Sequence, residues 1–99
     1  MSLGGELSEV FGADGKVESI CDKVRNEVEA RLRKKYDMFK PDNYKTQVVT
    51  GTNYFIKVHV GGDEHLHLAV SQKLPCDGGN CLLTNIREGK SCHDPIEQF

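Results

Sequence analysis

The sequence predicts an α+β domain in which one helix lies across an antiparallel sheet. One long stretch carries apolar residues at three- and four-residue steps, which is typical of a helix with a single buried face. Several later runs alternate apolar and polar residues and are separated by turn signals, which is typical of strands joined by hairpins. A helix followed by antiparallel strands must bury its apolar face on the sheet, and this arrangement defines the α+β class.

The helix is expected over residues 16–36, with Asp14 as its N-terminal cap. The opposite face is charged, and Glu29 and Arg33 form an i,i+4 pair on it. Each apolar residue of the buried face stabilises the fold by about 1.5–3 kcal/mol when it is fully buried. The helix therefore requires an apolar surface, which the strands must supply. Its apolar stripe consists of Val17, Ile20, Cys21, Val24, Val28, Leu32 and Tyr36.

The strands are expected at residues 44–47, 52–61 and 65–71, with a last strand around Leu82, Leu83 and Ile86. The glycines at 61 and 62 mark the turn between the second and third runs. In the third run, His65 and His67 fall on the face opposite Leu66 and Leu68. We expect both histidines to lie on a solvent-exposed face.

Length and charge limit the classes of protein to which this chain can belong. With 99 residues the chain is expected to form a single domain, residues 1–99, whose first part, residues 1–15, is a Gly-rich flexible arm. The net charge of −2 argues against a nucleic-acid partner. Apolar runs fall well short of the roughly 20 residues that span a bilayer, so no membrane partner is expected. The start lacks the features of a signal peptide, and we expect a cytoplasmic protein.

The link between the first two strands is unusual. An ordinary hairpin turn carries polar residues with Gly, Asn or Asp at its tip, whereas Val48 and Val49 stand here, followed by Thr50 and Gly51. Neighbouring strand residues point to opposite faces, so both valines cannot reach the same core. At least one valine is expected at the surface, where exposed apolar groups often mark a contact with a partner.

The four cysteines do not form an obvious disulfide framework. Cys21 lies on the apolar face of the helix, which leaves an odd number for pairing and favours a reducing compartment. Cys76 and Cys81 flank a Gly-rich turn, and whether they pair is left open. A zinc site that adds Cys92 and His93 matches no common ligand spacing.

Catalysis is not expected from this chain. A nucleophile and base pair made of Cys76 and His93 would lack an orienting residue, an oxyanion site and a cleft. We therefore expect neither an enzyme nor a protein that carries a metal or other cofactor.

A known family shares several of these features in the same order. Residues 47–51 resemble the central QxVxG motif of the cystatins, which are protein inhibitors of papain-like cysteine proteases. The following run, residues 52–60, resembles the strand found after that motif in the stefins, the intracellular type 1 branch. Leu74-Pro75 resembles the second hairpin loop of stefins, and His93-Asp94 with Phe99 resembles a stefin ending. The resemblance covers nearly the whole chain.

This resemblance implies a cystatin-like fold, in which about five antiparallel strands wrap around the helix. It implies a reversible, tight-binding, competitive inhibitor of papain-like cysteine proteases such as cathepsins, with a three-part wedge that occludes the active-site cleft. The alternative is a non-inhibitory interaction module on the same fold. A monomer is expected, with a dimer formed by exchange of the first hairpin left open. The protease-binding residues implied are Leu3, Gly4, Gly5, Gln47, Val48, Val49, Thr50, Gly51, Leu74 and Pro75.

Overall fold

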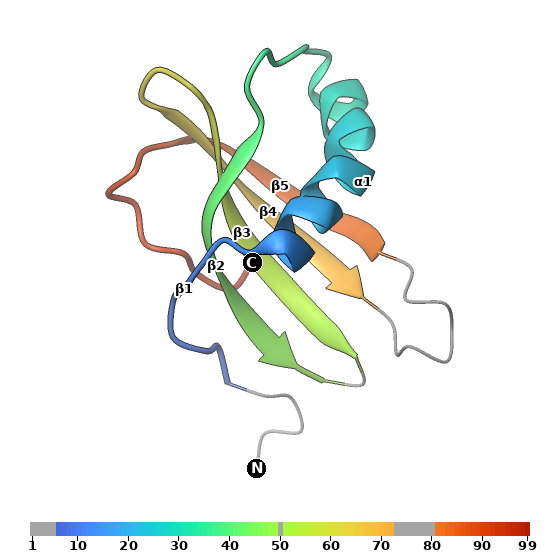
Figure 1. The fold of residues 1–99 in the computed structure, drawn as a ribbon, viewed down its shortest axis with the longest axis vertical. Helices are drawn as coiled ribbons and strands as arrows, with labels where there is room; N and C mark the ends of the chain where they lie inside the picture. Colours follow the sequence, from blue (N-terminus) through green and yellow to red (C-terminus); the bar gives the residue numbers. More distant parts are fainter. Residues whose placement is uncertain (1–5, 50, 73–80) are drawn as a thin grey trace.

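A five-stranded antiparallel sheet and one helix make up the fold in the computed structural model, which describes residues 6–49, 51–72 and 81–99 (Figure 1). The strands are ordered β1-β2-β3-β4-β5 across the sheet, so every strand is bonded to its neighbour in sequence. This arrangement confirms the predicted α+β class and the cystatin-like fold. The elements are β1 Phe11–Gly12, α1 Gly15–Leu32, β2 Lys40–Val48, β3 Thr52–Gly61, β4 Glu64–Gln72 and β5 Cys81–Lys90.

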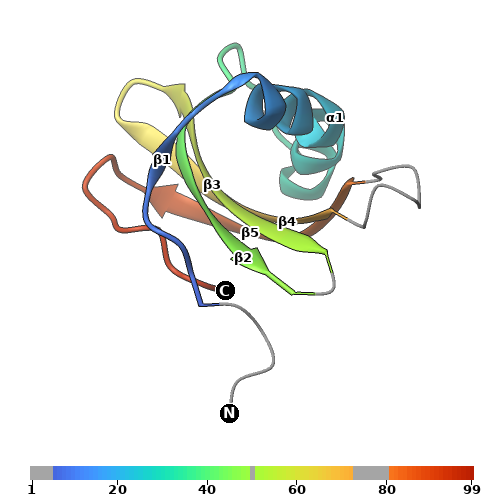
Figure 2. The same ribbon diagram turned by 60° about the horizontal axis from the view of Figure 1, so that its bottom comes forward.

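The main core lies between α1 and the concave face of the sheet, which curves around the helix (Figure 2). The part of the predicted stripe that lies on α1 faces this core, because three- and four-residue steps place its residues on one side of the helix. Val17, Ile20, Cys21, Val24 and Val28 are buried, and Leu32 is partly buried. β3 and β4 contribute every second residue to the same core, and β2 and β5 contribute one buried residue each. The strand residues in this core are Tyr44, Tyr54, Ile56, Val58, Val60, Leu66, Leu68, Val70 and Leu83. Within the described residues, no helix is long and apolar enough to cross a membrane.

The ends of α1 agree only in part with the prediction. Asp14 is the N-cap as expected, and its Oδ1 accepts a hydrogen bond of 3.0 Å from the backbone N–H of Val17. The C-terminal end was predicted too late, because the helix stops at Leu32 and Arg33 adopts the left-handed conformation (φ 56°). Tyr36 is still buried, and its backbone N–H donates to Oε2 of Glu29 at 2.9 Å. The apolar stripe therefore continues past the end of the helix, through a folded-back chain.

The convex face of the sheet is also covered, and this overturns the prediction for the two histidines. His65 and His67 are 4% and 2% exposed rather than solvated. The segment after β5 crosses this face, where Lys57 Nζ donates a 2.9 Å hydrogen bond to the carbonyl oxygen of Cys92. A second, smaller apolar cluster forms on the same face. It contains Phe55, Ala69 and Ile96, with Leu7 and Phe99 packed against them.

The described part of the expected N-terminal arm is bonded to the sheet. Phe11 and Gly12 form β1, which pairs with Tyr44 and Asn43 of β2. Further toward the N-terminus, the backbone N–H of Ser8 donates to the carbonyl oxygen of Thr46 at 2.8 Å. The prediction from sequence missed this short strand, because two residues carry no alternating pattern.

Candidate functional site

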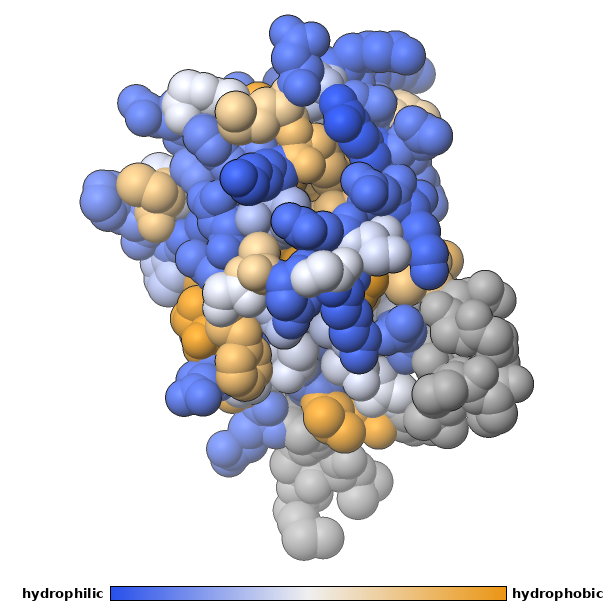
Figure 3. Space-filling view, in the orientation of Figure 1, coloured by the Kyte–Doolittle hydropathy of each residue, from blue (hydrophilic) through white to orange (hydrophobic). Residues whose placement is uncertain are grey.

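The loop between β2 and β3 presents two valines to solvent. Val48, the last residue of β2, is 64% exposed, and Val49 is 40% exposed. The backbone N–H of Val49 donates to the carbonyl oxygen of Gly51 at 3.0 Å, which holds the loop in a tight reversal. At least one valine was predicted at the surface, and both are there. In Figure 3, hydrophobic surface is visible at the lower end of the molecule, where Figure 1 places this hairpin.

The sheet supports this loop from both strands. Gln47 pairs with Asn53, and Asn53 Nδ2 donates to Oε1 of Gln47 at 3.2 Å. Val48 pairs with Thr52 in the next register position. The valines are thus carried on a bonded strand end rather than on a long loop, which limits the entropy that they lose on contact with a partner. Thr50 lies outside the described residues.

The second hairpin leaves the sheet beside the first one. Thr52 pairs on one side with Val48 and on the other with Gln72, the last residue of β4. Gln72 in turn pairs with Cys81, the first residue of β5. The register therefore aligns Val48, Thr52, Gln72 and Cys81 in one row across the sheet. Leu74 and Pro75 belong to the connection that starts from this row, and they lie outside the described residues.

The N-terminal segment runs to the same end of the sheet. It is antiparallel to β2, from Phe11 beside Tyr44 to Ser8 beside Thr46. The pairing is reinforced by a second hydrogen bond, in which the backbone N–H of Thr46 donates to Oγ of Ser8 at 2.9 Å. From Phe11 to Ser8 the chain therefore runs toward the end of the sheet that carries the first hairpin. Leu3, Gly4 and Gly5 lie outside the described residues.

One further apolar residue at this end was missed from the sequence. Leu82 follows Cys81 at the start of β5, pairs with Ser71 and is 57% exposed. The signal was available, because Leu82 and Leu83 are neighbours in a strand and only Leu83 can face the core.

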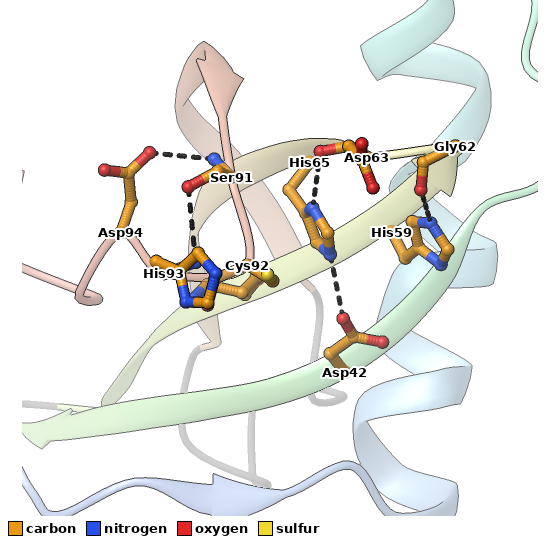
Figure 4. A network of polar contacts seen from close by, with 10 residues as sticks. Asp42, His59, Gly62, Asp63, His65, Ser91, Cys92, His93 and Asp94 are labelled. Carbon is orange, nitrogen blue, oxygen red and sulfur yellow. Dashed lines mark hydrogen bonds and ion pairs between the residues drawn. The ribbon is translucent and has the colours of Figure 1, made fainter.

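His59 and His65 lie near the other end of β3 and β4, and each makes its own polar contacts (Figure 4). The rings of His59 and His65 stack with centroids 4.8 Å apart. His65 Nε2 lies 3.0 Å from Oδ2 of Asp42, and its Nδ1 lies 3.2 Å from the carbonyl oxygen of Asp63. In the described part of the chain, no three His, Cys, Asp or Glu side chains are placed to share a metal ion. Of the zinc ligands considered, Cys76 lies outside that part.

Comparison with known proteins places this architecture in one family. The model of the cystatin domain family matches residues 5–93. The chain is 48% identical over 99 residues to Cystatin-B of Oplegnathus fasciatus, covering 100% of this chain and 98% of that protein. It is 48% identical over 97 residues to Cystatin-B of Paralichthys olivaceus, covering 98% and 99% of the two chains. Identity to human Cystatin-B is 42% over 95 residues, covering 96% and 97%.

The family match spans most of the chain, and the similarity to Cystatin-B extends over nearly the full length of each relative. The resemblance noted in the QxVxG-like loop and the strand after it is thereby confirmed. This chain belongs to the cystatin family of cysteine protease inhibitors, in its stefin branch.

Proposed function

We propose that this protein is a reversible, tight-binding, competitive inhibitor of papain-like cysteine proteases of the cathepsin type. The observation that carries the proposal is the row from Val48 through Thr52 and Gln72 to Cys81. Because of this register, the exposed valines and the base of the second hairpin leave the sheet side by side. The N-terminal segment reaches the same end through Ser8 and Thr46. Three segments distant in sequence can thus enter one cleft together.

Inhibition by this wedge is occlusion. Val48 and Val49 are largely exposed, so their apolar surface is available for burial against the walls of a protease cleft. In the proposed complex Leu74 and Pro75 provide the second contact, and Leu3, Gly4 and Gly5 extend along the cleft beside the catalytic thiol. The wedge presents no peptide bond in line for attack, so the inhibitor is not consumed.

The expected affinity follows from the rigidity of the first loop. Its strand ends are bonded through Gln47, Asn53 and Thr52, so little ordering is required when it docks. An interface near the standard size of about 1,600 Å² then supports nanomolar or tighter binding. Gly51 accepts the hydrogen bond from Val49 that closes the loop, and its lack of a Cβ atom lets its backbone approach the enzyme surface.

The proposal also assigns the chain to the cytoplasm, as a monomer without catalytic activity of its own. Its support is membership of the stefin branch together with the pattern of cysteines, of which Cys21 is 1% exposed in the core. The competing function is that of a non-inhibitory interaction module, which predicts that papain stays active in the titration described below.

Titration of papain with the purified protein tests the proposal. Papain activity is expected to fall linearly to zero at one molecule of inhibitor per active enzyme, with trypsin unaffected as the control for protease class. At lower enzyme concentration, substrate should relieve the inhibition competitively, and mass spectrometry should recover the inhibitor uncleaved. A folded protein that leaves papain fully active at a large molar excess would establish the non-inhibitory module instead.

A further inference from the structure

The small apolar cluster on the convex face joins the two ends of the described chain. Its members are Leu7, Phe55, Ala69, Ile96 and Phe99, and we call it the convex cluster. We propose that Phe99 is a positioning residue for protease inhibition, which acts by holding Leu7 and thereby fixing the direction of the N-terminal arm. The inference rests on the inhibitory function proposed above.

Phe99 is held on the sheet by two strands. Its ring lies over Phe55 of β3, with centroids 5.7 Å apart and planes inclined by 56°. The guanidinium of Arg87, on β5, lies 4.9 Å from the centre of the same ring. Beneath these contacts, Phe55, Ala69 and Ile96 are each 3% exposed. Phe99 is therefore docked in a defined position and is able to support another segment.

The segment that leads to Phe99 is itself anchored. After β5, the backbone N–H of Ser91 donates to Oδ2 of Asp94 at 2.8 Å, and the backbone N–H of Asp94 donates to the carbonyl oxygen of Ser91 at 3.2 Å. The hydrogen bond from Lys57 Nζ to the carbonyl oxygen of Cys92 ties this turn to β3. These contacts fix the approach of the segment to the convex face.

Leu7 connects this support to the arm. Leu7 packs against the buried residues of the convex cluster, and its neighbour Ser8 is joined to Thr46 by two hydrogen bonds. The views of Figures 1 and 2 agree in placing the end of the chain close to the N-terminal segment. Leu7 is thus the apolar anchor that stands nearest in sequence to Leu3, Gly4 and Gly5. Loss of the Phe99 side chain would remove one of the two partly buried residues that pack on Phe55, Ala69 and Ile96, and Leu7, the other one, would then be held less firmly.

A purely structural role for Phe99 makes a different prediction. If the convex cluster only stabilised the fold, loss of Phe99 would lower the stability of the whole sheet. The folded molecules that remain would still form a complex with the protease of unchanged lifetime. If Phe99 positions the arm, its loss should change the lifetime of the complex, and only while the arm is present. This difference separates the two roles.

The first experiment measures amide hydrogen exchange in the free protein, which needs no protease. In Phe99→Ala, the amide of Ser8 should exchange about tenfold faster than in the wild type, because its strand pairing opens locally. The amide of Ala13, which donates to the carbonyl oxygen of Asp42 at 3.2 Å, is the internal control and should not change relative to the core amides. Phe99→Leu keeps an apolar side chain and should restore most of the protection of Ser8. Unchanged exchange at Ser8 in folded Phe99→Ala would overturn the proposal.

The second experiment measures the rate of dissociation from papain in a double-mutant cycle. Phe99→Ala should dissociate about fivefold faster than the wild type, and should add little to a variant that lacks residues 1–4. Phe39→Ala, which truncates an aromatic packed against the other core, is the matched control and should not change the dissociation rate. An equal effect of Phe99→Ala with and without the arm would show that Phe99 contacts the protease directly, and would overturn the positioning role.

The two experiments distinguish a failure of the proposed function from a failure of the role proposed for Phe99. If the wild-type protein does not inhibit papain, the proposed function is wrong, whereas exchange at Ser8 still decides whether Phe99 holds the arm. If inhibition is found and exchange at Ser8 is insensitive to Phe99, the proposed function stands and the further inference is wrong.

Discussion

Lys57 donates a 2.9 Å hydrogen bond to the carbonyl oxygen of Cys92 across the convex face of the sheet. The lysine is only 5% exposed, so its ammonium group has exchanged water for this carbonyl. We expect Lys57→Ala to lower the free energy of unfolding by about 2 kcal/mol, because both a charged hydrogen bond and the packing of the aliphatic stem are lost. Urea unfolding measures the change. Lys23→Ala, at an exposed position on α1, is the control, and an equal loss in both variants would contradict the role of Lys57.

His67 should make the stability of the protein depend on pH. Burial, together with the nearby charge of Lys57, lowers the pKa of His67 from 6.5 to about 4. The unfolded chain therefore binds a proton at this residue between pH 6.5 and pH 4, while the folded chain does not. Stability is fully present above pH 6.5 and is lost as the pH falls toward 4, by roughly 2 kcal/mol between pH 7 and pH 5.

The variant His67→Gln tests this dependence, because it removes the titrating group. Chemical unfolding at pH 7 and pH 5 should give a clearly smaller difference in stability for His67→Gln than for the wild type. His93→Gln, at an exposed position, should retain the wild-type difference. A difference that is the same in all three proteins would show that other groups cause it.

Val49→Asp should abolish most of the inhibition while the domain stays folded. The substitution replaces apolar surface that the complex would bury with a carboxylate that would have no partner, and the affinity for papain should fall by about a hundredfold. Met38→Asp is closely matched, since Met38 is 42% and Val49 40% exposed in the free protein. Its inhibition constant should not change. Normal inhibition by folded Val49→Asp would remove the loop from the proposed wedge.

Deletion of residues 1–4 should act on the dissociation rate. The arm is expected to add contacts after the loops have docked, so its loss should speed dissociation by about tenfold and change the association rate little. The thermal unfolding temperature should stay the same, because the deletion leaves the contacts of Leu7 and Ser8 with the sheet in place. Stopped-flow and displacement kinetics provide both rates. An identical dissociation rate would exclude Leu3 and Gly4 from the site.

Cys21 should resist thiol reagents in the native protein. It is 1% exposed, and burial raises the pKa of its thiol to about 12, so almost no thiolate is present near pH 8. Cys92 is exposed and should react first. Alkylation with iodoacetamide followed by peptide mass mapping measures both residues, and full denaturation should equalise them. Rapid native labelling of Cys21 would indicate that α1 detaches readily from the sheet.

The spacing of apolar and polar residues predicted the elements whose positions depend only on nearby sequence. Thr52–Gly61 was located correctly because apolar and polar residues alternate along it. The end of α1 was misplaced because Arg33, rather than a glycine, adopts the left-handed conformation, and Tyr36 continues the apolar spacing beyond the helix. His65 and His67 are buried although they alternate with the core residues of β4, and His65 contacts Asp42, which is more than twenty residues away. Periodicity within β4 does not report such long-range contacts.

Only part of the candidate site could be predicted from local sequence. Val48 and Val49 stood out because apolar residues are unusual at a hairpin, and both are exposed. Their position beside the second hairpin required the register through Thr52, which depends on pairing between strands rather than on any single segment. The convex cluster was likewise hidden, since Leu7 and Phe99, which both pack on it, lie at opposite ends of the sequence.

The shared pairing of Thr52 has a consequence for anyone who wishes to retarget this molecule. The first hairpin leaves the sheet from Val48 and Thr52 and the second from Gln72 and Cys81, all in one row, so the lateral distance between the centres of their bases is set by two strand spacings. Changes in the sequence and length of the loops alter how far the hairpins extend and which side chains they present. The lateral distance between the bases of the two hairpins stays constant. A protease with a wider cleft must therefore be matched by longer side chains at the tips, and one with a narrower cleft by shorter side chains, because the spacing of the strands is fixed.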